Sequence, residues 1–154
     1  MADRILKNVK VSSKLTDIEI TDGKISHVGR TDKSGEDMGG LKAYPGLIDI
    51  HTHGALGMDV TSGGHLYELS VYQSSQGVTA WYPTTTTASF DTIYNVTHEN
   101  TEFDRGAKIM GFHMEGPYVN EKYKGAQNEK FIKNPSLEEF LEFKNVKLIT
   151  LAPE

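Results

Sequence analysis

The sequence has no cysteine among its 154 residues. That absence excludes a disulfide framework and any metal site built on thiolates, and it fits a reducing compartment. Positive charge is also scarce, because 16 Lys and Arg against 21 Asp and Glu leave a formal net charge of −5. Since phosphate neutralisation needs a basic surface, this balance argues against nucleic acid as a partner. We therefore expect a cytoplasmic protein that does not bind nucleic acid.

A long apolar run is missing as well. The first residues lead directly into a strand pattern, without an apolar leader segment. The longest uncharged stretch, residues 69–90, is rich in Ser, Gln and Thr and contains Gly77 and Pro83, so no membrane partner is expected. Length sets a further limit, because a complete (β/α)₈ barrel needs at least about 200 residues. The chain is too short to be one.

What is present divides into two predicted domains. Residues 1–43 alternate apolar and polar side chains at period two around Asp22-Gly23, the strongest short-range signal of a β-hairpin. Within them, residues 31–40 have the polar, Gly-rich composition of a linker. We interpret residues 1–43 as part of a small β layer and residues 44–154 as a second domain.

The second domain alternates strands with helices. Strands are predicted at residues 47–51, 77–83, 108–115 and 146–151, and helices at 64–76, 89–96 and 135–143. Pro83 is expected to end the second strand, and residues 84–87 to form a loop. Such alternation predicts an α/β fold with a parallel sheet and helical crossovers.

Two histidines follow the first predicted strand of this domain. His51 and His53 are two residues apart, so in a strand both imidazoles point to one face and can converge on a single cation. Neutral imidazole is a good ligand for zinc and for iron-type divalent ions. Parallel α/β folds also build their active sites after strand C-termini. A pair of hydrogen-bonding loop histidines remains the alternative.

A carboxylate ends the third predicted strand. Glu115 carries a charge into the mouth of a parallel sheet, which is costly unless the charge is paired or coordinates a metal. It is a candidate third ligand, and a surface glutamate beginning a loop is the alternative. His113 shares its face and is expected to support a ligand, although it could instead contact substrate or only satisfy its own hydrogen bonds. Further along, Gln127 offers a donor and an acceptor in what is otherwise only a loop.

These motifs carry a family resemblance. Residues 45–54, Pro-Gly-Leu-Ile-Asp-Ile-His-Thr-His-Gly, are similar to the first-strand signature of the amidohydrolase superfamily. Residues 111–118, which include His-Met-Glu-Gly-Pro, and the later Lys124-Gly125-Ala126 resemble more specifically the N-acetylglucosamine-6-phosphate deacetylases. The resemblance covers the whole chain. It implies the N-terminal portion of a TIM (β/α)₈-type metallo-dependent hydrolase barrel, truncated after about four strands, preceded by part of a small β-sandwich.

The resemblance also implies roles for individual residues. It implies that His51, His53 and Glu115 bind a divalent metal ion, and these ligand types leave Zn, Fe, Mn and Co open. It implies substrate contacts by Ala126 and by Gln127, although some members carry histidine at the latter position. The family's two further histidine ligands and its catalytic aspartate have no counterpart here. No catalytic residue is therefore expected within the chain.

The activity implied is removal of acetate from N-acetylglucosamine 6-phosphate to give glucosamine 6-phosphate, a step of amino-sugar catabolism. The resemblance further implies that the intact enzyme is a homodimer. Two alternatives stay open: another amidohydrolase, similar to dihydroorotase or dihydropyrimidinase, and a non-catalytic fragment or one half of a split enzyme. We expect the 154-residue chain alone to be inactive.

Overall fold

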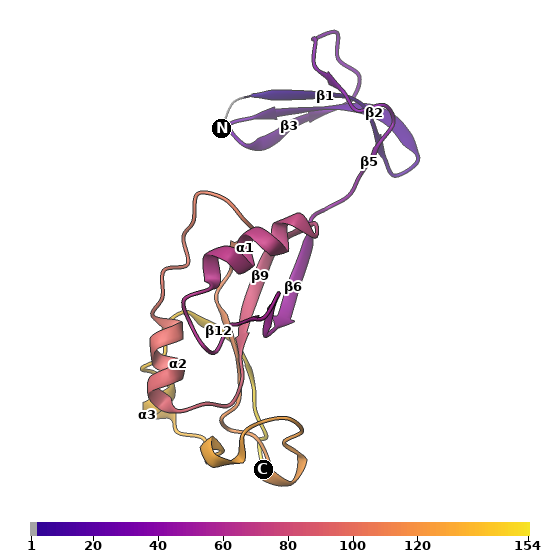
Figure 1. Ribbon diagram of the computed structural model, residues 1–154. Coiled ribbons are helices and arrows are strands. Elements are labelled where there is room, and N and C mark those ends of the chain that lie inside the picture. The colour runs from indigo at the N-terminus through magenta and orange to yellow at the C-terminus, as the bar shows by residue number, and fades with distance from the viewer. Residues whose placement is uncertain (1–2) are drawn as a thin grey trace. The chain divides into compact units, whose positions relative to one another are not determined.

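The computed structural model describes residues 3–154, which divide into two compact units. The first unit ends at Pro45, and the second runs from Gly46 to Glu154. Figure 1 labels elements of each unit where there is room. Each unit has its own sheet and its own buried residues.

The first unit is a five-stranded sheet. Its strands are β1 (Arg4–Val11), β2 (Lys14–Thr21), β3 (Lys24–Val28), β4 (Glu36–Asp37) and β5 (Lys42–Ala43). Strands β1, β2 and β3 pair antiparallel, whereas β4 and β5 pair in parallel with β1. The predicted hairpin is confirmed, because Asp22 and Gly23 have φ values of 51° and 73°, the positive angles that a tight two-residue turn requires.

Two details of this unit differ from the expected pattern. The expected linker contains β4, which pairs with β1. Asp17, a polar residue in the alternating pattern, is fully buried. Its carboxylate accepts hydrogen bonds from the backbone N–H groups of Asn8 and Thr31, each at 3.0 Å, and lies 3.0 Å from Lys7 Nζ. Because these partners satisfy the charge, the carboxylate can lie in the interior.

The second unit has the predicted alternation of strands and helices. Its main elements are β6 (Leu47–Thr52), α1 (Leu66–Ser75), β9 (Val78–Thr85), α2 (Phe90–Thr97), β10 (Lys108–Ile109), β11 (Phe112–Glu115), α3 (Leu137–Phe140) and β12 (Val146–Thr150). Short elements fill the connections: the hairpin of β7 (Gly54–Ala55) and β8 (Met58–Asp59), and the 3₁₀ turns η1 (Glu121–Tyr123) and η2 (Glu129–Phe131).

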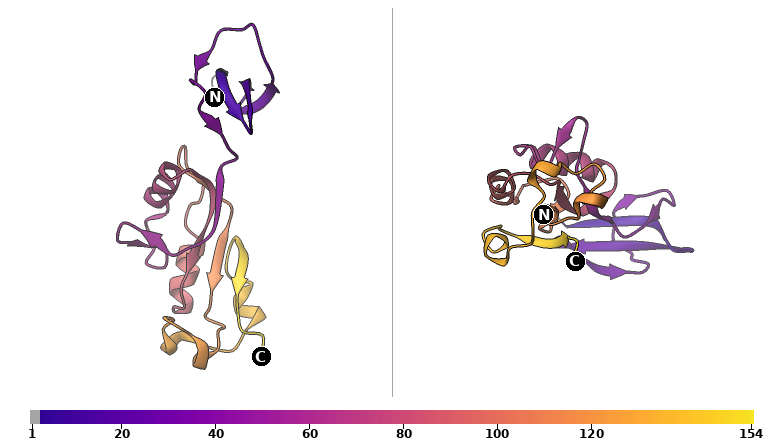
Figure 2. Two further views of the ribbon diagram at one scale, coloured as in Figure 1. Left: turned by 90° about the vertical axis from the view of Figure 1, so that its right-hand side faces the viewer. Right: turned by 90° about the horizontal axis from the view of Figure 1, so that it is seen from below.

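The main sheet of this unit is parallel throughout. Its strands lie in the order β6, β9, β11 and β12, and β10 pairs with the first half of β9 on the side where β11 pairs with the second half. Neighbours in sequence are thus neighbours in space, as in the first strands of a (β/α)₈ barrel. Figures 1 and 2 show α1 and α2 on the same side of these strands. The predicted α/β class is confirmed.

Strand β9 continues through Pro83, so the expectation that this proline ends the strand is wrong. Pro83 lies where β9 changes partner: β10 pairs at Ala80 and Trp81, and β11 pairs from Thr84 onward. The sheet therefore needs no hydrogen bond from the missing N–H at that point. Thr84 and Thr85, expected in a loop, are strand residues and are fully buried.

The third predicted strand and the third predicted helix also differ in extent. The strand is broken into β10 and β11 at Gly111, where φ is 139°. The helix α3 ends at Phe140, and Leu137 and Leu141 are 72% and 71% exposed, although both were expected on its packed side. Phe143, from the same predicted apolar face, is buried. Part of that face therefore has no packing partner among residues 3–154.

The core of the second unit lies between the sheet and its helices. Trp81 of β9 is fully buried against Leu69 of α1, and its indole Nε1 donates to Ser70 Oγ at 3.1 Å. A second cluster joins Ile93 of α2 to Met114 of β11. These contacts hold the strand ends at fixed positions. Among residues 3–154, no helix has the length and apolar character needed to cross a membrane.

Candidate metal centre

Three predicted ligands meet at the carboxyl ends of two strands. His51 on β6, His53 directly after it and Glu115 on β11 place one ligand atom each within 4.8 Å of the others. Glu115 Oε2 lies 2.7 Å from His51 Nε2 and 3.0 Å from His53 Nε2, and the two nitrogens are 3.3 Å apart. The three side chains thus converge on one point, as their spacing and their strand-end positions indicated.

The ring of His53 is held by the neighbouring strand. Its Nδ1 lies 3.1 Å from the carbonyl oxygen of Thr84, so Nδ1 carries the proton and donates it. In the neutral imidazole this leaves the Nε2 lone pair facing Glu115. Gly54 follows at once, and a Cβ there would lie 2.0 Å from the carbonyl oxygen of Met58. Glycine therefore lets the chain enter the β7–β8 hairpin directly after the ligand.

Two acceptors face each other at the centre of this cluster. The lone pair of His53 Nε2 and the anionic Oε2 of Glu115 lie 3.0 Å apart, which is repulsive unless a proton or a metal ion lies between them. Around a tetrahedral ion with ligand bonds of about 2.0–2.1 Å, ligand atoms lie about 3.3 Å apart. The two histidine nitrogens lie at this separation, and Glu115 Oε2 lies closer to each of them. Two imidazoles with one carboxylate are a donor set of catalytic zinc sites. The residues present fit a divalent metal ion.

His113 lies beside the cluster rather than in it. It is buried on β11, with Nδ1 3.3 Å from Thr84 Oγ1 and Nε2 2.9 Å from Thr150 Oγ1. Its ring packs edge to face against the ring of His51, with centroids 4.7 Å apart. Burial lowers the pKa of His113, and the nearby His51 acts in the same direction. A neutral ring at this position is placed to support His51. This supporting role of His113 stays a prediction.

The loop after β11 reaches the cluster through one side chain. Gln127 Nε2 donates to Glu115 Oε1 at 3.1 Å, and Gln127 Oε1 accepts from the backbone N–H of Thr87 at 2.7 Å. Reasoning from the sequence named Gln127 only as a substrate contact and missed both bonds. Ala126 is exposed in the same loop. Substrate contact by Ala126 or Gln127 stays a prediction.

Thr84 is a site residue that reasoning from the sequence missed. Its carbonyl accepts from His53, and its hydroxyl accepts from the backbone N–H of Thr52 at 3.0 Å while facing His113. The hydroxyl proton goes to the carbonyl oxygen of Tyr82 at 3.1 Å. The available signal was position, because Thr84 is the second-to-last residue of β9, the strand that lies between the two ligand-bearing strands.

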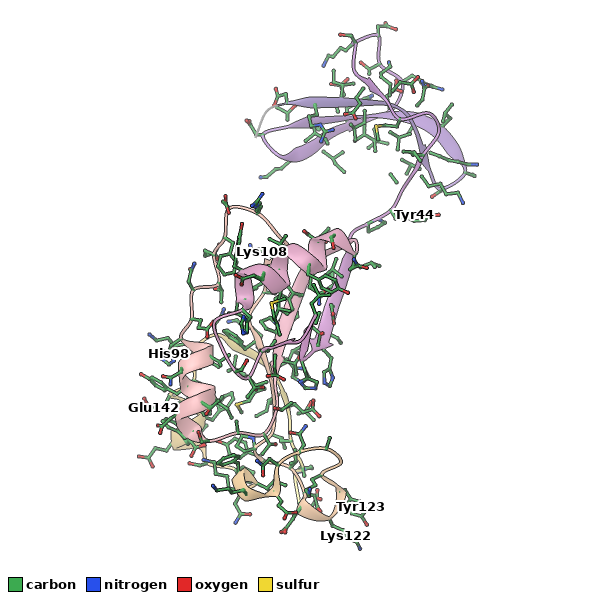
Figure 3. The ribbon with its side chains drawn as sticks, in the orientation of Figure 1. Tyr44, His98, Lys108, Lys122, Tyr123 and Glu142 are labelled. Atoms are coloured by element: carbon green, nitrogen blue, oxygen red, sulfur yellow. The ribbon has the colours of Figure 1, made fainter. Side chains whose placement is uncertain are left out.

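The remaining histidines lie outside the cluster. His27 is on β3 of the first unit, His65 precedes α1, and His98 follows α2. Figure 3 shows His98 at the outer edge of the second unit, near Glu142 and away from the strands. Lys122 and Tyr123 likewise project outward from the connection after β11 (Figure 3). His27 is exposed, whereas His65 and His98 are half-buried, and none of the three belongs to the cluster of His51, His53 and Glu115.

Solved structures similar to this chain define its class. An N-acetylglucosamine-6-phosphate deacetylase from Thermotoga maritima has a TM-score of 0.79 and 29% identity, covering 97% of this chain and 42% of that one. A Mycobacterium smegmatis deacetylase, in complex with N-acetyl-D-glucosamine-6-phosphate, has a TM-score of 0.85 and 20% identity, covering 100% of this chain and 44% of that one. With the parallel sheet and the strand-end ligands, these likenesses place the fold in the amidohydrolase barrel class, present here in part.

Curated relatives narrow the class. An N-acetylglucosamine-6-phosphate deacetylase from Vibrio furnissii is 34% identical over 140 residues, which is 84% of this chain. The chain is homologous to the N-acetylglucosamine-6-phosphate deacetylases, and it spans only 35% of the length of this relative. No family model matches the chain. The family resemblance inferred from the motifs is thereby confirmed.

Proposed function

We propose that this chain supplies metal-binding residues to a hydrolase that removes acetate from N-acetylglucosamine 6-phosphate. The observation that carries the proposal is the convergence of His51, His53 and Glu115 at the strand ends of a chain homologous to enzymes of that name. The related Mycobacterium smegmatis structure holds this sugar phosphate. Zinc, iron, manganese and cobalt all accept two imidazoles and a carboxylate, so the metal is proposed only as a divalent ion.

The chemistry divides between the metal and the chain. When bound, a divalent ion supplies polarisation of the amide carbonyl and a lowered pKa of water. The chain's own part is to hold and orient ligands: Thr84 fixes the ring of His53, and β11 carries Glu115 to the same point. The side chains of His51 and His53 are 48% and 38% exposed, which leaves room for a substrate beside them. We place Ala126, exposed in the loop after β11, against that substrate.

A general base is proposed to come from outside this chain. Amide hydrolysis needs a group that takes a proton from water and returns it to the leaving amine. Among residues 3–154, the cluster holds Glu115 as its single carboxylate, and the ligand role occupies that group. The isolated chain is therefore proposed to bind metal without hydrolysing the substrate. The alternative is a non-catalytic chain, whose His51, His53 and Glu115 belong to no complete enzyme.

The test is a chimera in which this chain replaces the matching part of the Vibrio furnissii relative. We expect the purified chimera to release acetate from N-acetylglucosamine 6-phosphate when a divalent metal is added. Changing His51 and His53 together to Ala should abolish the release, whereas His98→Ala, on the outer edge of the unit, should not. A folded chimera that releases no acetate, or one that is indifferent to the double change, overturns the proposal.

A further inference from the structure

We infer that Gln127 is a positioning residue, which fixes the oxygen that Glu115 presents to the metal centre. The inference rests on the proposed function, because it assigns a task within the proposed metal site. It is distinct from a substrate contact, since it concerns a bond made inside the protein. The bond joins a loop side chain to a ligand twelve positions earlier in the chain.

The two oxygens of Glu115 have different surroundings. Oε2 faces both imidazoles, at 2.7 Å from His51 Nε2 and 3.0 Å from His53 Nε2. Oε1 accepts the hydrogen bond from Gln127 Nε2 at 3.1 Å. The last torsion of a glutamate side chain is broad and roughly two-fold, so the carboxylate has no strong preference of its own. The Gln127 bond therefore selects one orientation and leaves one oxygen free for an ion.

The direction of the Gln127 amide is itself fixed. The backbone N–H of Thr87 can only donate, and it lies 2.7 Å from Gln127 Oε1. The amide oxygen must therefore face Thr87, and the NH₂ group must face Glu115. Thr87 is buried, and its side chain lies directly against Gly116, where a Cβ would be 2.1 Å from Thr87 Oγ1. The anchor of the amide thus packs against the residue that follows the ligand.

Two hydrogen bonds within the loop hold the backbone of Gln127. The backbone N–H of Gln127 donates to the carbonyl of Lys124 at 3.2 Å, and Lys124 Nζ donates to the carbonyl of Gln127 at 3.1 Å. The side chain bridges two places that are far apart in sequence, the segment after β9 and the end of β11. Partners of this kind around a metal ligand orient it, and their loss typically weakens metal binding about 10–100-fold.

Two variants separate the two bonds of the bridge. Gln127→Met has a similar length and removes both bonds, whereas Gln127→Glu keeps an oxygen for Thr87 and replaces the donor to Glu115 with another acceptor. Amide hydrogen exchange on the metal-free chain measures whether the Thr87 N–H keeps its hydrogen bond to residue 127. We expect faster exchange at the Thr87 N–H in Gln127→Met and unchanged exchange in Gln127→Glu.

Titration of the 154-residue chain with Co²⁺, followed by visible absorption, reads the metal site. We expect Gln127→Met to weaken Co²⁺ binding about 10–100-fold and both variants to change the absorption spectrum, since the ligand geometry changes. Gln76→Met, a glutamine exposed after α1, is the matched control and should behave as the unmodified chain. Thermal melting followed by circular dichroism checks that each variant is folded. If Gln127→Met is unfolded, the spectrum of Gln127→Glu alone tests the role of Gln127.

The outcomes distinguish this inference from the proposed function. If the unmodified chain binds no Co²⁺, or binds it equally well after His51→Ala, the proposed metal site is wrong and the role of Gln127 falls with it. If binding requires His51 but both Gln127 variants keep the original affinity and spectrum, the metal site stands and only the positioning role is wrong.

Discussion

Nδ1 of His53 lies 3.1 Å from the carbonyl oxygen of Thr84 on the neighbouring strand. This hydrogen bond sets both the tautomer and the direction of the ring, because a backbone carbonyl can only accept. The Nε2 lone pair is thereby turned toward Glu115. The fold itself therefore orients His53 for the proposed metal site.

Removal of His53 should abolish strong metal binding. His53→Ala takes away one ligand atom and leaves Glu115 with a single imidazole partner. Loss of a hydrogen-bond partner of a metal ligand typically weakens metal binding about 10–100-fold. We expect the affinity of His53→Ala for Zn²⁺ to fall by more than this. Equilibrium dialysis measures the affinity, and His98→Ala is the control. Equal affinity in the two variants would show that His53 is not a ligand.

Adjacent threonines on β9 should respond differently to the same change. Thr84→Val removes an acceptor used by the backbone N–H of Thr52 and a partner of His113, so we expect a loss of about 1–3 kcal/mol in the free energy of unfolding. Thr85 is equally buried, but its hydroxyl has no hydrogen-bond partner among residues 3–154. Thr85→Val should therefore be neutral or stabilising. Urea unfolding compares the two, and an equal loss in both would contradict the assignment.

The meeting of the three ligands could be predicted because it follows from two general rules. Residues two apart in a strand share a face, which brings His51 and His53 together. Carboxyl ends of parallel strands meet at one edge of a sheet, which brings Glu115 to them. Both rules use only local spacing and the order of elements, and both can be read from a sequence.

The groups that hold the ligands could not be predicted in the same way. Thr84 binds a histidine 31 positions earlier, and Gln127 binds a glutamate 12 positions earlier, so each bond depends on the path of the chain in between. The expectation for Pro83 failed for a similar reason. Its missing N–H matters only in relation to neighbouring strands, and β9 changes partner at that point.

The first unit contains a carboxylate that links its stability to pH. Hydrogen bonds from the backbone N–H of Asn8, then from that of Thr31 and from Lys7, lower the pKa of Asp17 well below its ordinary value of 3.8. The unfolded chain then takes up this proton more readily than the folded one. The stabilisation by Asp17 is therefore fully present above about pH 4 and is lost as the pH falls through the folded-state pKa.

Unfolding of the first unit at different pH values tests this relation. We expect Asp17→Asn to be less stable than the unmodified chain at pH 7 and to lose less stability between pH 4 and pH 2. Urea unfolding followed by the methyl NMR signals of Val9 and Ile18, both buried in this unit, provides the measurement. Asp32→Asn, at an exposed position, should keep the original pH dependence. Identical pH profiles for Asp17→Asn and the unmodified chain would count against the relation.

Strand β6 presents an open edge together with apolar side chains. It pairs with β9, and among residues 3–154 no strand pairs with its other edge. Leu47, Ile48 and Ile50 on this strand are 61%, 64% and 58% exposed. An unpaired edge next to exposed apolar surface favours pairing with another chain. We therefore expect the isolated 154-residue chain to self-associate.

Sedimentation velocity on the isolated chain measures this association. Ile48→Lys combined with Ile50→Lys should shift the chain toward monomer, because a charge on the edge strand must be desolvated before another strand can pair there. Leu56→Lys is the matched control, since Leu56 is 74% exposed but lies in the turn between β7 and β8. It should leave the distribution unchanged if the edge of β6 drives the contact. A monomeric unmodified chain would contradict the expected self-association. An equal effect of Leu56→Lys would mean that general apolar exposure, rather than the edge of β6, drives it.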